Sequence, residues 1–91
     1  MDDGAVIAVA SRVVGTELDG EFVMLDPDSG NYYGLNEVGS TVWRLIASPR
    51  RLDEVVAHVC ATFEVAPDRC RADVEQLLSE LANRQLVTVS Q

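Results

Sequence analysis

The chain has few aromatic residues and few cysteines, and the shortage of cysteine argues against one class of protein. Only 5% of the 91 residues are aromatic, and two are cysteines, Cys60 and Cys70. A secreted domain of this length usually depends on a denser set of disulfides. We therefore expect both thiols to be reduced and mostly buried, as free cysteines usually are.

Basic charge and long apolar runs are also scarce. Seven basic residues stand against 15 acidic ones, which gives a net charge of −8. This field repels the phosphates of nucleic acids and suits a partner that carries some basic residues, so we expect no nucleic-acid partner. No apolar stretch approaches the roughly 20 residues of a membrane span, and the start Met1-Asp2-Asp3 does not resemble a secretory signal. We expect a cytoplasmic protein that makes no membrane contact.

Residues that could carry chemistry are sparse. The one histidine, His58, lies two residues from Cys60 on an expected helix, where such side chains face apart. The acidic residues lie in turns and helix starts, where solvation and capping explain them. Gly30, Gly34 and Gly39 fit no phosphate-binding spacing. We therefore expect no enzyme, no metal site and no cofactor.

What is present is the composition of one soluble globular domain, with 47% apolar residues over residues 1–91. Residues 5–36 are rich in Val, Tyr and Gly, whereas residues 37–85 show helical periodicity. Residues 1–5 are expected to be disordered.

The first half predicts an antiparallel meander of three strands. Residues 6–14 supply one strand or two short pieces, and Asp19-Gly20 is a tight-turn signal between strand formers. Residues 26–30 are dense in turn-forming residues. The three expected strands cover residues 12–18, 21–25 and 31–35.

The second half predicts three helices. Asn36 is a suitable N-cap for the first helix, which ends at Ser48-Pro49. The second helix starts near Leu52, and Pro67 suits the first position of the third helix. A short extended tail or last strand follows at residues 86–89. The class is α+β, with an N-terminal three-stranded antiparallel meander followed by three helices in a winged-helix-like arrangement.

The third strand is the candidate binding element. Edge strands carry unpaired N–H and C=O groups and are a template for another chain. Strand alternation sends Tyr33 and Leu35 to one face, as core residues or as the floor of a pocket, and Tyr32 to the other. The candidate residues of this strand are Asn31, Tyr32, Tyr33, Gly34 and Leu35.

The third helix supplies the other wall of the expected groove. Its apolar stripe is wide enough to serve two surfaces, and we assign Leu78 and Leu81 to the core. Asp73 is either a partner for a basic or N–H group of a peptide or a solvated helix acid. Trp43 of the first helix is expected in the core. The stripe residues expected to border the groove are Cys70, Val74 and Leu77.

Three segments together resemble a known family. Residues 25–43 read Leu-Asp-x-x-Ser-Gly-x-Tyr-Tyr-x-Leu-Asn-x-x-Gly-x-x-x-Trp, residues 52–56 read Leu-Asp-Glu-Val-Val, and residues 72–81 read Ala-Asp-Val-Glu-x-Leu-Leu-x-x-Leu. In order and spacing they resemble the PqqD-like peptide recognition elements. The chain is most similar to the stand-alone leader-peptide-binding proteins of lasso-peptide biosynthetic clusters, over roughly residues 12–87.

The resemblance implies a fold and a function. It implies that the leader of a ribosomally made precursor peptide adds as a further strand to the third strand, against the third helix. It also implies two partners, a separate cysteine protease that removes the leader and a cyclase that closes the ring. Arg51 departs from the family, which usually has Ser or Thr before the second helix. The alternative from the element order is a winged-helix DNA-binding module, against which the net charge argues.

Overall fold

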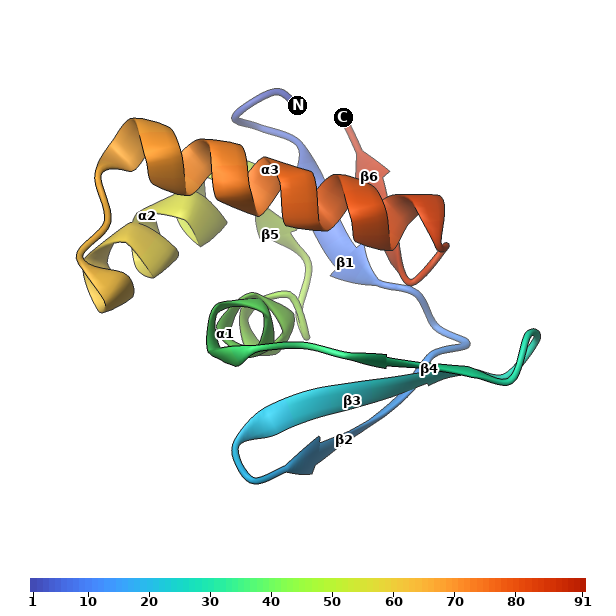
Figure 1. Ribbon diagram of the computed structural model, residues 1–91. Helices are drawn as coiled ribbons and strands as arrows, with labels where there is room; N and C mark the ends of the chain where they lie inside the picture. Colours follow the sequence, from blue (N-terminus) through green and yellow to red (C-terminus); the bar gives the residue numbers. More distant parts are fainter.

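The computed structural model describes residues 1–91 and has the predicted α+β class, with a meander of three strands before the three helices (Figure 1). The three helices follow the meander in the chain, but further short strands stand outside it. In chain order the elements are β1 Val6–Val9, β2 Val14–Leu18, β3 Glu21–Asp26, β4 Asn31–Gly34, α1 Glu37–Leu45, β5 Arg50–Arg51, α2 Leu52–Phe63, α3 Pro67–Asn83 and β6 Val87–Ser90.

The predicted meander is the antiparallel sheet β2-β3-β4. Asp19 and Gly20 have positive φ angles of 54° and 84°, as the two-residue turn favoured by an Asp-Gly pair requires. In the second turn the Asp26 carboxylate accepts the backbone N–H of Asp28 at 3.0 Å, and Gly30 takes a positive φ of 74°. The turn chemistry therefore sets the register that places Tyr33 opposite Met24.

A second three-stranded sheet, β5-β1-β6, joins the two ends of the chain. The segment at residues 6–14 forms two pieces, β1 and the start of β2, and the tail forms the last strand. Val6 to Val9 pair antiparallel with Val87 to Ser90 on one side, while Val6 and Ile7 pair with β5 on the other. The sequence analysis did not anticipate β5 or this second sheet.

The helices begin where their capping residues predicted. The Asn36 side chain accepts the backbone N–H of Gly39 at 2.9 Å, and Pro67 occupies the first turn of α3. Arg51 gives α2 no side-chain cap of the usual kind, but its own backbone N–H donates to the Glu54 carboxylate at 3.4 Å. The first turn of α2 is thus held by an acid inside the helix.

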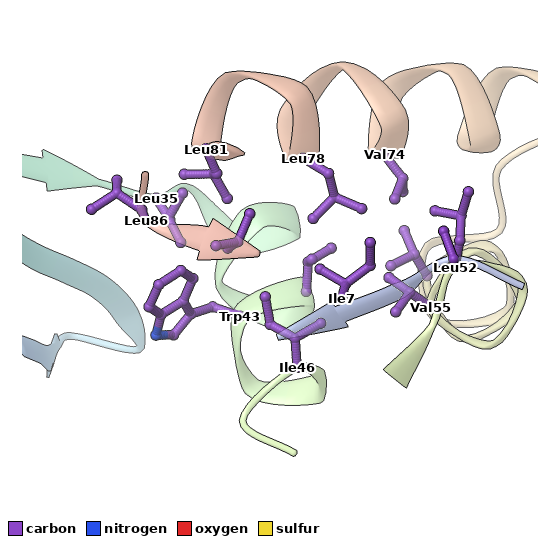
Figure 2. Packing of buried hydrophobic residues seen from close by; sticks show 14 of the residues in the cluster. Ile7, Leu35, Trp43, Ile46, Leu52, Val55, Val74, Leu78, Leu81 and Leu86 are labelled. Carbon is purple, nitrogen blue, oxygen red and sulfur yellow. The ribbon is translucent and has the colours of Figure 1, made fainter. Parts of the chain in front are cut away.

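The core lies between α3, the β5-β1-β6 sheet and the other two helices. Figure 2 shows Leu78 and Leu81 pointing down from α3 into this space, and both are fully buried, as predicted. Trp43 is 6% exposed and is a core residue, also as predicted. Ile7 of β1, Ile46 directly after α1 and Leu52 of α2 meet them there.

Residues 1–5, for which the sequence predicted disorder, contact the two later helices in the structure. Ala5 is fully buried, and its carbonyl accepts the backbone N–H of Leu52 at 2.8 Å. Asp3 pairs with Arg71 of α3. None of the helices has the length and apolar content needed to cross a membrane.

Candidate functional site

One edge of β4 carries no strand. β4 pairs with β3 on one side. The Leu35 N–H donates to the carbonyl of Phe22 at 2.9 Å, and this bond identifies which residues direct their backbone groups toward β3. Because the direction of these groups alternates along an antiparallel strand, the N–H and C=O groups of Tyr32 and Gly34 point away from β3. These four groups are the open template for another strand.

The side chains of β4 divide as the alternation predicted. Tyr32 is 74% exposed on the outer face of the sheet, whereas Leu35 is 5% exposed and belongs to the core. Tyr33 is half-buried on the inner face and reaches toward the C-terminal end of α3. A Cβ on Gly34 would meet nothing within 4 Å, so the space beside the strand is open there.

The wall of α3 that faces β4 is identified by two contacts of Tyr33. The Tyr33 hydroxyl lies 3.5 Å from the Glu80 carboxylate, and the guanidinium of Arg84, directly after α3, lies over the ring at 4.7 Å from its centroid. Helical spacing of i, i+4, i+7 and i+11 places the half-buried Leu77 and the exposed Asp73 in the same stripe as these two residues.

The structure corrects the assignment of two residues of α3. Cys70 and Val74 were expected at the groove but are 2% and 1% exposed and belong to the core. The Cys70 thiol points to α2, where it donates to the carbonyl of Val56 at 3.6 Å. Near the N-terminal end of α3, on the side turned away from β4, Arg71 pairs with Asp3. This contact also helps to set the rotation of α3 about its axis.

Glu80 and Arg84 were missed by the sequence analysis. The signal was available, because both continue the i, i+4 stripe that starts at Asp73 and Leu77. The groove side of α3 is mostly charged while its core side is apolar, so the apolar pattern of the helix marks only the core side.

Arg12 connects the two segments that flank the candidate site, the β3–β4 turn and the residues after α3. Its guanidinium pairs with Asp26 and Asp28 in the β3–β4 turn and donates to the backbone carbonyl of Gln85 at 3.0 Å. The hydrogen bond from Arg12 lowers the pKa of the Asp26 carboxyl below its ordinary value. Arg12 therefore holds the turn before β4 against the segment after α3.

A cavity of about 210 Å³ opens between these two segments, at the Asn31 end of β4. Its lining combines polar side chains of the turn with aromatic and charged side chains from both walls. The lining residues are Asp26, Ser29, Asn31, Tyr32, Tyr33, Arg84 and Leu86.

The two thiols lie away from this edge. Burial raises the pKa of the Cys70 thiol, and the Cys60 thiol donates to the carbonyl of Val65 at 2.9 Å. Cys60 lines a separate, more open hollow of about 500 Å³ between α2 and the start of α3. No three His, Cys, Asp or Glu side chains are grouped to hold a metal ion.

Comparisons with known proteins show a similar fold and a family. The solved structure of TbiB1 in complex with the TbiA(beta) leader peptide is 34% identical, with a TM-score of 0.82, over 88% of this chain and 93% of that one. No curated protein matches the chain. Residues 21–87, which run from β3 to the start of β6, match the family described as coenzyme PQQ synthesis protein D (PqqD). The chain therefore belongs to the PqqD family.

Proposed function

We propose that this protein binds the leader of a ribosomally made precursor peptide by adding it as a strand to β4, against α3. The observation that carries the proposal is the open backbone edge of Tyr32 and Gly34, which lies beside the stripe of α3 that Tyr33 contacts. The similar TbiB1 structure was solved with a leader peptide bound, which supports the same role for this chain.

The peptide is held by backbone and side-chain contacts together. Four open backbone groups form hydrogen bonds worth about 0.5–1.5 kcal/mol each, while ordering a flexible segment costs about 2–5 kcal/mol. The two contributions nearly cancel, so apolar anchors of the peptide must supply the affinity, in the micromolar to nanomolar range. The proposed contact residues are Asn31, Tyr32, Tyr33 and Gly34 of β4 with Asp73 and Leu77 of α3, whereas Leu35, expected in the same set, is a core residue whose backbone groups are already bonded.

The protein acts as a recognition element without catalysis of its own. We propose that the whole chain forms one peptide-binding domain that delivers the precursor to a separate leader-cleaving cysteine protease and to a lasso cyclase. The single histidine, His58, is exposed on α2, outside the residues that line the cavity beside β4.

A direct titration tests the proposal. The leader of a cognate precursor peptide, labelled with a fluorophore, is titrated with the folded protein and followed by fluorescence polarisation. Saturable binding that a scrambled leader of equal composition does not show is the expected result. A protein with a native circular dichroism spectrum that binds neither peptide would contradict the proposal.

A further inference from the structure

Arg84 is a basic residue without a counter-charge in a strongly acidic chain. All seven basic residues are arginines, and five of them form ion pairs: Arg12, Arg44, Arg51, Arg69 and Arg71. Arg50 and Arg84 form none, although the chain has 15 acidic residues. The side chain of Arg84 also donates no hydrogen bond within the chain, which leaves its N–H donors free.

The surroundings of Arg84 hold it beside the open strand edge. Its guanidinium lies over the ring of Tyr33, a contact that orients a planar cation. Arg84 also lines the cavity at the Asn31 end of β4, together with the exposed polar residues Ser29 and Asn31. A carboxylate in this cavity would meet a cation and polar side chains.

Two acidic residues nearby could compete for Arg84, and both have other partners. Asp26 lines the cavity but pairs with Arg12 and accepts the backbone N–H of Asp28. Glu80 lies one helical turn before Arg84, and its carboxylate is 3.5 Å from the Tyr33 hydroxyl. Neither carboxylate lies within ion-pairing distance of Arg84.

We propose that the Arg84 cavity is a subsite for one acidic side chain of the bound peptide. This inference rests on the proposed function and adds the chemistry that sets the register. Backbone hydrogen bonds along an edge are equivalent after a slip of two residues, so they do not define which peptide residue faces which position. A carboxylate on Arg84 selects one register, because only one residue of the peptide reaches the end of β4.

An aspartate scan of the leader tests the subsite. Each residue of the leader is replaced in turn by Asp, and each native acid by its amide, and the affinities are measured by fluorescence polarisation. We expect a single position where a carboxylate strengthens binding by about 3- to 10-fold. This gain disappears in Arg84→Gln and increases in Glu80→Gln, which removes a neighbouring negative charge that repels the peptide carboxylate.

Arg50→Gln is the matched control, because Arg50 is also an unpaired arginine but lies in β5, outside the cavity lining. Arg50→Gln changes the net charge by the same amount as Arg84→Gln and should leave the gain in affinity intact. A scan with no Arg84-dependent position, or an equal loss in Arg50→Gln, overturns the subsite while binding of the parent leader still supports the proposed function. A parent leader that does not bind at all overturns both.

Discussion

The hydroxyl of Ser40 accepts the backbone N–H of Phe22 at 2.9 Å. The same hydroxyl donates to the carbonyl of Leu35 at 3.2 Å, so it is inserted into the last rung of the β3–β4 ladder. Ser40 lies on α1 and is the only polar residue that is fully buried. One side chain thus joins both strands to the first helix at the end of the proposed binding edge.

Replacing Ser40 should therefore weaken the fold. Ser40→Ala leaves the Phe22 N–H and the Leu35 C=O without their partner and should lower the free energy of unfolding by about 1–3 kcal/mol. Urea denaturation followed by circular dichroism measures it. Thr41→Ala is the control, because its hydroxyl bonds only the Glu37 carbonyl on the helix surface and its loss should stay within about 0.5 kcal/mol. Equal stabilities of the two variants would mean that β3 and the end of β4 pair directly, without the Ser40 hydroxyl between them.

Proline at Gly34 should abolish peptide binding while leaving the fold intact. Gly34→Pro removes an N–H that points away from β3, and proline is tolerated at such edge positions. We expect the affinity for the leader to fall at least about tenfold, since the ring also blocks an approaching strand. Gly15→Pro makes the same change on β2, the opposite edge of this sheet, and should keep the native affinity. Equal losses in both variants would disprove the role of β4.

The stability of the β3–β4 turn should depend on pH through Asp26. The hydrogen bond from Arg12 lowers the pKa of this carboxyl in the folded state from an ordinary value of 3.8. Its stabilising contribution is therefore fully present above that value and is lost as the pH falls through the folded pKa. Melting temperatures of wild type and Asp26→Asn should differ at pH 7, and the difference should shrink only as the pH falls below 3.8. Asp2→Asn, at an exposed residue in no ion pair, should show no such convergence.

Cys70 should resist alkylation in the folded protein. Burial raises the pKa of its thiol, which lowers the fraction of reactive thiolate, and the side chain is closed off between α2 and α3. In a Cys60→Ser background, iodoacetamide at pH 8 should modify Cys70 far more slowly than free glutathione. Denaturing urea should restore the rate. Rapid labelling without denaturant would show that α2 and α3 separate readily.

Elements whose signals are local were predictable from the sequence. Asp19-Gly20 specifies the hairpin turn through its own backbone preferences, and Asn36 and Pro67 mark the starts of α1 and α3 by capping. The pairing of β1 with β6 joins the two ends of the chain, and no local pattern in Val6–Val9 reveals its partner. Non-local pairing is therefore what the sequence analysis left out.

The candidate site was predicted in part for the same reason. The side chains of Tyr32 and Leu35 point to opposite faces of the sheet, as predicted, because alternation along a strand is a local property. The rotation of α3 about its axis depends on what packs on each side of it, including the contact of Arg71 with Asp3. The wrong assignment of Cys70 and Val74 to the groove follows from that rotation.

The antiparallel pairing of β1 with β6 brings the two termini together, and Figure 1 shows both of them well separated from β4. A short peptide linker between the ends would close the chain into a ring without spanning the molecule. New ends could then be opened at the Asp19-Gly20 turn, away from the cavity lining. The fold is thus suited to circular permutation and to insertion within a larger polypeptide, with its ligand surface still accessible.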